Sequence, residues 1–152
     1  MRFLKLCFAW LSATAVAAVT GSVVQTQFNL GAIAALGAPV PWDERLATTL
    51  HDLAGFAPLY AAIVGAGFLV AFVLAALLVR AWPARRTLLY ALSGIASVIT
   101  TIVLMNALLP VVGIGATRWA SGIAALGAAG GLGGCTFAVL TLRRHPGMAW
   151  RR

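Results

Sequence analysis

Five polar residues of this 152-residue chain have side chains suited to binding or acting on a ligand: Glu44, His51, Asp52, Asn106 and Arg118. Arginine suits an anionic headgroup, because its planar guanidinium donates paired hydrogen bonds to phosphate or carboxylate oxygens. Histidine is suited to act as a base near neutral pH. These five residues are therefore the candidate ligand-binding set, for a lipid or a small apolar molecule, with His51 as the base if the protein is an enzyme.

The spacing of these residues favours neither a metal site nor a catalytic centre. Glu44 and His51 are seven positions apart, so on a helix they share a face but are separated by two turns. Two ligands of one metal on a helix are usually three or four positions apart. Cys7 and Cys135 form no CxxC pair. We therefore predict no metal, no cofactor and no catalytic residue, with a solvated helix face as the simpler interpretation of His51 and Glu44.

Asn106 differs from the other four because it lies inside an apolar stretch, about one turn before Pro110. A polar side chain at that depth in a membrane requires a partner. We expect either a hydrogen bond to Gln25 or Gln27 on a neighbouring helix, or a contact with a ligand.

The elements that position these residues are apolar segments. The chain is 62% hydrophobic and 9% charged, and a helix needs about 20 apolar residues to cross a bilayer. Four segments meet this requirement, at about residues 4–24, 58–79, 87–109 and 120–142. The sequence predicts an all-α membrane protein with one four-helix domain over residues 1–152 and leaves the order of the helices in the bundle open. The first segment also resembles a signal peptide, although its apolar run is long for one.

The long segment between the first two spans, residues 25–57, is expected to be an outer loop with an amphipathic helix at about residues 43–55. Asp43 is the expected N-cap. Leu46, Leu50 and Leu53 recur at helical spacing, which favours a helix lying on the bilayer or capping the bundle. A short apolar helix is expected before it, over residues 28–37. Gly55 should end the amphipathic helix, and Pro58 should begin the second span.

Charge predicts the orientation. All three acidic residues fall between the first and second spans. All but two of the eleven basic residues flank the other ends of the spans: Arg2, Lys5, Arg80, Arg85, Arg86, Arg143, Arg144, Arg151 and Arg152. The positive-inside rule therefore places both termini in the cytoplasm, with residues 143–152 as a basic cytoplasmic tail. Basic residues at helix ends contact lipid headgroups and do not indicate nucleic-acid binding. The preference for arginine over lysine, with abundant alanine and glycine, suggests a bacterial inner membrane.

The fourth span carries overlapping GxxxG pairs, formed by Gly127 with Gly131 and by Gly130 with Gly134. Bare glycine lets the backbone of another helix approach closely. This predicts a helix-packing surface, either against the chain's own spans or at an interface with a second copy or another protein.

These observations favour a non-enzymatic accessory or scaffold subunit, or a self-associating bundle, whose partners are membrane lipids and another membrane protein or a second copy. The first alternative is a protein that binds or acts on a lipid or small apolar molecule at the outer leaflet through the five-residue set. The second is a small transporter of a neutral solute, lined by Ser93, Ser97, Thr101 and Asn106. A closed, dry bundle interior would count against transport.

Overall fold

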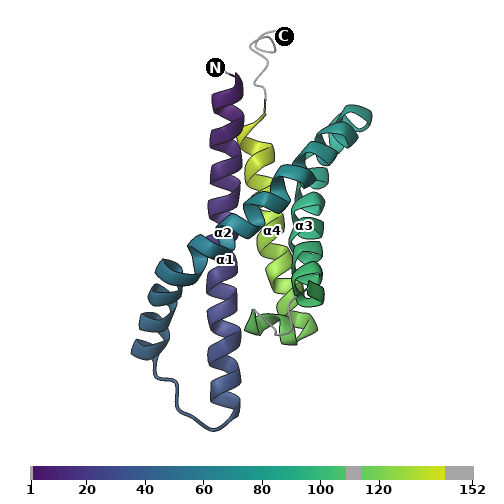
Figure 1. The fold of residues 1–152 in the computed structure, drawn as a ribbon. Coiled ribbons are helices and arrows are strands. Elements are labelled where there is room, and N and C mark those ends of the chain that lie inside the picture. The colour runs from purple at the N-terminus through teal and green to yellow at the C-terminus, as the bar shows by residue number, and fades with distance from the viewer. Residues whose placement is uncertain (1, 109–113, 143–152) are drawn as a thin grey trace, which may run out of the picture.

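The computed structural model of the chain describes residues 2–108 and 114–142. Four long helices account for most of it: α1 (Arg2–Ala35), α2 (Trp42–Ala81), α3 (Arg86–Leu108) and α4 (Ala120–Leu140) (Figure 1). Two short 3₁₀ turns, η1 (Pro83–Arg85) and η2 (Gly115–Arg118), precede α3 and α4. All four helices are long and apolar enough to cross a membrane, which confirms the predicted all-α membrane fold. The predicted basic tail, residues 143–152, lies outside the described residues.

The helices pack in chain order around the bundle. α1 and α3 each contact both α2 and α4. Each helix therefore lies beside the helices that precede and follow it in the chain, and α1 and α4 close the ring. The start of α1, η1 and the end of α4 lie at one end, whereas the α1–α2 connection and η2 lie at the other (Figure 1). We call the first the basic end, because it carries Lys5, Arg80, Arg85 and Arg86, and the second the acidic end, because it carries all three acidic residues.

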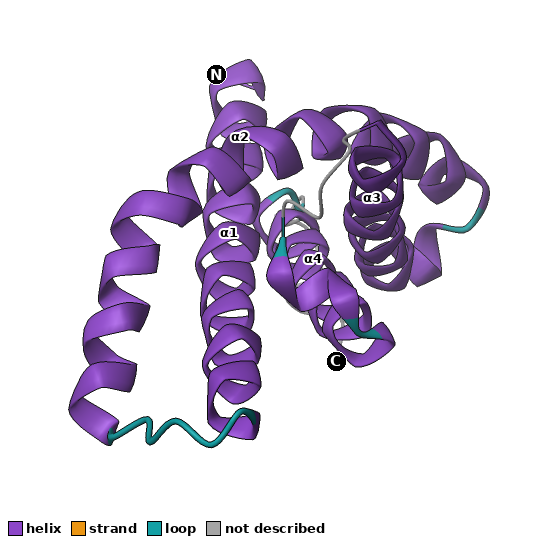
Figure 2. Cartoon of the chain, turned by 60° about the horizontal axis from the view of Figure 1, so that its bottom comes forward, coloured by secondary structure: helices purple, strands orange, loops and turns teal. Residues whose placement is uncertain are grey.

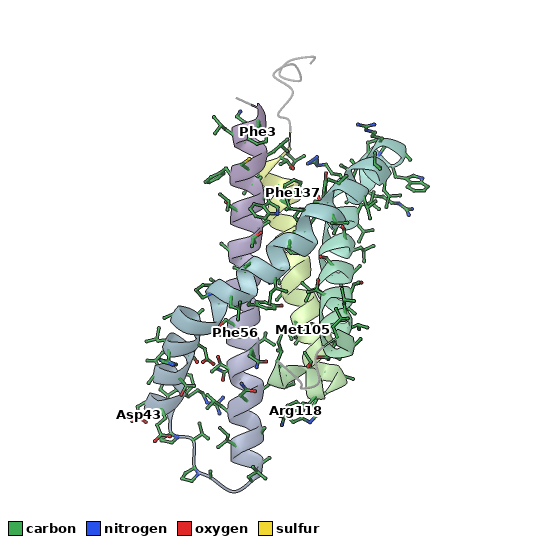
Figure 3. All side chains as sticks on the ribbon, viewed as in Figure 1. Phe3, Asp43, Phe56, Met105, Arg118 and Phe137 are labelled. Atoms are coloured by element: carbon green, nitrogen blue, oxygen red, sulfur yellow. The ribbon has the colours of Figure 1, made fainter. Side chains whose placement is uncertain are left out.

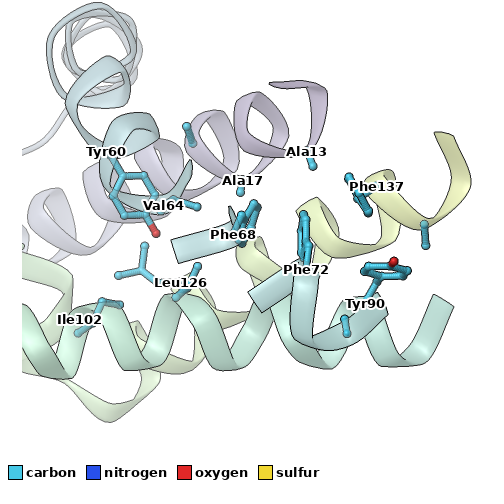
Figure 4. Close-up of a cluster of buried hydrophobic side chains, with 14 of the residues drawn as sticks. Ala13, Ala17, Tyr60, Val64, Phe68, Phe72, Tyr90, Ile102, Leu126 and Phe137 are labelled. Atoms are coloured by element: carbon cyan, nitrogen blue, oxygen red, sulfur yellow. The ribbon is translucent and has the colours of Figure 1, made fainter. Parts of the chain in front are cut away.

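An aromatic cluster packs between the helices from the middle of the bundle toward the basic end (Figure 4). Phe72 of α2 lies 4.5 Å from Phe68 and 4.6 Å from Phe137 of α4, measured between ring centroids. Tyr90 of α3 lies 5.1 Å from Phe137. Ala13 of α1 belongs to the same core and leaves room for these rings. Because the rings occupy the space between the helices, the bundle has a filled core at this level.

The glycines of α4 set how closely α3 and α4 approach. A Cβ atom on Gly130 would lie 2.5 Å from the carbonyl oxygen of Gly94, and one on Gly134 would collide with the carbonyl oxygen of Tyr90. The helix backbones are therefore in direct contact at these positions. Gly127 and Gly131 face isoleucine side chains of α3. Of the two predicted roles, packing inside the chain accounts for all four glycines, which leaves them unavailable to a partner.

α1 is longer than the predicted first span. It continues through Gln25 and ends at Ala35, and the apolar segment expected as a separate helix over residues 28–37 forms its last turns. The predicted outer loop of residues 25–57 is therefore wrong in extent, since only residues 36–41 lie outside α1 and α2. Gly37, with φ of +88°, ends the helix, and its N–H donates to the carbonyl of Ala34 at 3.0 Å.

The predicted amphipathic helix is present, but it is the first part of α2 and not a separate element. Gly55 does not end it, and Pro58 lies inside the helix. Proline cannot donate to the carbonyl one turn earlier, and the helix bends near this position (Figure 1). The N-cap is Pro41 and not Asp43, which lies in the first turn. This part of α2 runs beside α1, because α1 extends far enough to pair with it.

Candidate functional site

The candidate site is the helical hairpin at the acidic end, made by residues 25–35 of α1, residues 42–56 of α2 and the connection between them (Figure 2). We call it the acidic-end hairpin. It projects past the rest of the bundle, since α1 is 34 residues long and α4 is 21. At 1.5 Å per residue these helices are about 51 Å and about 32 Å long, and the hydrocarbon layer is about 30 Å thick.

Polar side chains join the two arms of the hairpin. Thr26 donates a hydrogen bond of 2.7 Å to the carboxylate of Asp52. Arg45 donates one of 2.6 Å to the amide oxygen of Gln27, and the amide nitrogen of Gln27 donates one of 3.2 Å to Thr49. Arg45, Thr49 and Asp52 are spaced by four and three residues, so they share the face of α2 that meets α1. The bonds fix the position of the hairpin.

A second polar cluster joins α1 to η2. The amide oxygen of Gln25 accepts a hydrogen bond of 2.9 Å from the backbone N–H of Ala116. The backbone of Gly115 lies against Asn29, leaving no room for a Cβ atom. Gln25 is buried, so its amide supplies a partner to a backbone group that water does not reach. This bond holds the turn before α4 against α1.

The structure separates the five predicted ligand-binding residues. Asp52 belongs to the α1–α2 cluster, whereas Asn106 donates a long hydrogen bond of 3.5 Å to Thr117 beside η2. The sequence predicted Gln25 or Gln27 as the partner of Asn106, whereas the partner in the structure is Thr117. His51, Glu44 and Arg118 are exposed. Arg118 lies on η2, away from the start of α2 that carries Asp43 (Figure 3).

The five residues line neither of two cavities that the described residues form. One of these cavities adjoins Phe28 and Trp119, and the other opens at the basic end. Within residues 2–108 and 114–142, no group of three His, Cys, Asp or Glu side chains could hold a metal ion. Asp52 accepts a hydrogen bond from Thr26, which makes it part of the packing between helices. The arrangement therefore offers structural hydrogen bonds instead of a converging set of acid, base and anion-binding groups.

Sequence reasoning missed Thr26, Gln27, Arg45 and Thr49 as members of one cluster. The spacing of Arg45, Thr49 and Asp52 was a usable signal for a polar helix face. Their partners could not be found in the same way, because they lie on a part of α1 that the sequence had placed in a loop.

An apolar stripe on α2 stays exposed in the hairpin. Trp42, Leu46 and Leu50 recur every four residues and are 76%, 53% and 59% exposed. At 100° per residue they lie about a quarter-turn from the face that meets α1. His51 and Glu44 occupy the remaining face. We call Trp42, Leu46 and Leu50 the apolar stripe. Three large apolar side chains exposed along one face depart from an ordinary solvated surface.

A cavity of about 450 Å³ adjoins the hairpin. Phe28, Gly31 and Ala32 of α1 line one side, and Trp119 and Ser121 line the other. The rings of Phe28 and Trp119 are 6.1 Å apart between centroids. Gln27, which is already hydrogen-bonded in the hairpin, and Ser121 are its polar lining residues. The cavity suits an apolar molecule and contains no ionisable group.

The hydroxyl groups that would line a transport path lie between α3 and α2. Ser93 donates a hydrogen bond of 2.7 Å to the carbonyl oxygen of Ala71. The hydroxyls of Ser97 and Thr101 lie against Gly67, where a Cβ atom would meet them at 2.7 and 3.0 Å. These side chains pack against a neighbouring helix, and the aromatic cluster fills the bundle beside them. This arrangement counts against a route for a solute.

Comparison with protein-family models, with curated proteins and with solved structures finds no match for this chain, so its function must be argued from its own residues.

Proposed function

We propose that this chain is a non-enzymatic accessory subunit that docks a second membrane protein through the apolar stripe. The observation that carries the proposal is the arrangement of the acidic-end hairpin, whose polar side chains are bonded between its arms while Trp42, Leu46 and Leu50 face outward. Exposed apolar surface rimmed by polar residues is typical of interaction sites.

The position of the stripe favours a protein partner over lipid. We place the outer edge of the hydrocarbon near the bonds of Asp52 to Thr26 and of Gln25 to Ala116, because polar side chains begin there. Trp42 is ten residues before Asp52, which is about 15 Å along a helix. Headgroups add only about 5–8 Å on each side of the hydrocarbon. The tip of the stripe therefore reaches past the lipid, where another protein can cover it.

The hairpin is also held ready for binding. Three hydrogen bonds between its arms reduce the ordering that association would otherwise require. Tryptophan is enriched among the residues that dominate binding energy at interfaces. Trp42 is thus the expected anchor, with Leu46 and Leu50 extending the contact toward the membrane.

The proposal includes a location. We place the protein in a bacterial inner membrane with both termini in the cytoplasm, because the basic residues gather at the end that holds the start of α1, η1 and the end of α4. The acidic-end hairpin then faces out of the cytoplasm, and its partner is a membrane protein with an apolar surface just above the outer leaflet.

The test is purification of the tagged chain from its native membrane in mild detergent, followed by mass measurement of the intact complex. The variant Leu46→Glu with Leu50→Glu places charge in the stripe. Ala47→Glu is the matched control, because Ala47 is exposed on the same helix but outside the stripe. We expect a stoichiometric foreign protein with the wild type and the control, and its loss from the double variant.

Two results would contradict the proposal. A partner retained equally by all three chains would remove the stripe from the interface. A complex containing only copies of this chain, lost in the double variant, would make the stripe a self-association surface instead.

A second candidate function rests on the cavity beside Phe28 and Trp119. Its volume of about 450 Å³ lies within the range of roughly 300–1,000 Å³ typical of small-molecule sites. The ligand would be a lipid chain or a small apolar molecule, since the lining is mostly apolar. Gly31→Leu would fill the cavity, and loss of a co-purifying apolar molecule in that variant, without loss of a protein partner, would favour this function.

A further inference from the structure

A cavity of about 530 Å³ opens at the basic end of the bundle. All four helices contribute to its lining, through Leu6 of α1, Val79 of α2, Tyr90 of α3 and Phe137 of α4. Arg86, the first residue of α3, and Thr141, just after α4, complete the polar part. The cavity therefore combines an apolar wall with a single cationic side chain.

Arg86 is incompletely partnered. Its NH2 nitrogen donates to the hydroxyl of Thr141, and its guanidinium carbon lies 5.2 Å from the centroid of the Tyr90 ring. These contacts fix the plane of the guanidinium. The Nε nitrogen is buried and has no hydrogen-bond partner among residues 2–108 and 114–142. An unsatisfied buried donor on a charged group is costly, so this position suits an acceptor supplied by another molecule.

No acidic side chain is available to neutralise Arg86. The chain has three, Asp43, Glu44 and Asp52, and all lie in the first part of α2 at the acidic end. The described charged residues next in sequence to the lining residues are Lys5, Arg80 and Arg85, all exposed and all positive. The cavity thus has a positive field with no counter-charge from any side chain of the protein.

We propose that this cavity binds an anionic phospholipid, with its phosphate on Arg86 and an acyl chain along Leu6, Val79 and Phe137. Guanidinium groups bind phosphate oxygens through paired, charge-assisted hydrogen bonds. The apolar wall favours a lipid over free phosphate, because inorganic phosphate leaves that wall uncovered. Clusters of basic residues at helix ends attract anionic lipid of the adjoining leaflet. The site is independent of the apolar stripe, which lies at the other end of the bundle.

The test is a titration of the purified chain, freed of lipid in detergent, with phosphatidylglycerol, counting bound lipid by native mass spectrometry. Arg86→Gln removes the charge from the cavity. Arg85→Gln is the matched control, because Arg85 is the preceding residue but does not line the cavity. We expect Arg86→Gln to weaken binding by about tenfold or more and Arg85→Gln to change it by no more than about twofold. Equal binding by the two variants would overturn the proposal.

Two further measurements keep the result interpretable. Leu6→Trp fills the cavity while leaving Arg86 in place, and Leu6 is half exposed, so the helix should tolerate the change. Loss of phosphatidylglycerol from this variant is expected, and unchanged binding would contradict the site even if Arg86→Gln fails to fold. Inorganic phosphate is titrated in parallel, and displacement of the lipid by phosphate at equal concentration would show a free-anion site and overturn the lipid assignment.

Discussion

The hydroxyl of Thr26 donates a 2.7 Å hydrogen bond to the carboxylate of Asp52, joining α1 to α2 across 26 residues of sequence. The same oxygen lies 3.0 Å from the carbonyl of Ser22 in its own helix. One hydrogen cannot serve both acceptors fully, and the charged carboxylate is the stronger one. Thr26 is fully buried, so this bond is shielded from water and fixes the base of the acidic-end hairpin.

Removal of this carboxylate should destabilise the fold. Asp52→Ala leaves the Thr26 hydroxyl with only its own helix carbonyl, and we expect a loss of about 1.5–3 kcal/mol in the free energy of unfolding. Asp43→Ala is the control, because Asp43 is exposed and its loss should cost less than about 0.5 kcal/mol. Denaturant-induced unfolding in detergent micelles measures both. Equal effects would mean that the Thr26–Asp52 bond contributes nothing to stability.

The surroundings of Gly134 in α4 and of Gly31 in α1 predict opposite effects of alanine at these two positions. Gly134→Ala drives a methyl group into the backbone of Tyr90 and should destabilise the monomer by at least about 1–3 kcal/mol. Gly31 has no atom within 4 Å of an added Cβ, so Gly31→Ala should stabilise α1 by about 0.5–1 kcal/mol. Thermal unfolding of the two variants provides the comparison. A stable Gly134→Ala monomer that only loses an assembly would place this glycine at an interface instead.

The hydrogen bonds between the two arms of the acidic-end hairpin predict a specific cross-link. In a chain whose free cysteines, Cys7 and Cys135, are replaced by alanine, Gln27→Cys with Thr49→Cys should react with a short thiol-specific cross-linker. The reason is that the native side chains are hydrogen-bonded at 3.2 Å. Gln27→Cys with His51→Cys should react much less, because His51 lies on another face of α2. Gel mobility after proteolysis within residues 36–41 reports both pairs, and equal reaction would argue for a first part of α2 that is free of α1.

The distribution of charge predicts which end faces the cytoplasm. A reporter enzyme that is active only outside the cytoplasm should be active when fused after Gly37 and inactive when fused after Arg86, because Arg80, Arg85 and Arg86 hold the basic end inside. A fluorescent reporter that folds only inside should give the reverse pattern. Activity of both enzyme fusions, or the opposite assignment, would contradict the orientation.

The sequence alone determined that the protein is a bundle of four membrane-spanning helices. Spans need little more than length and an unbroken apolar composition, and these are local properties that tertiary contacts cannot reverse in lipid. The small residues of α4 also predicted close helix packing, because the absence of a side chain at Gly130 and Gly134 has the same consequence in any arrangement. The separation of Asp43, Glu44 and Asp52 from most of the basic residues was equally a property of the sequence.

Only the tertiary structure decided the roles of the polar residues and of the glycine and proline residues at the expected helix ends. Gln25 and Thr26 looked like the end of a span, but Ala116 and Asp52 supply their partners, so α1 continues to Ala35. Gly55 and Pro58 looked like a break, yet α2 is continuous through both. The packing of helices outweighs the local penalties, which are about 1 kcal/mol for glycine and about 3 kcal/mol for proline. The burial of the Arg86 Nε nitrogen beside an apolar wall likewise emerges only when the start of α1, the start of α3 and the end of α4 meet. Each outcome depends on contacts with residues distant in the chain, and the local spacing of residues cannot predict such contacts.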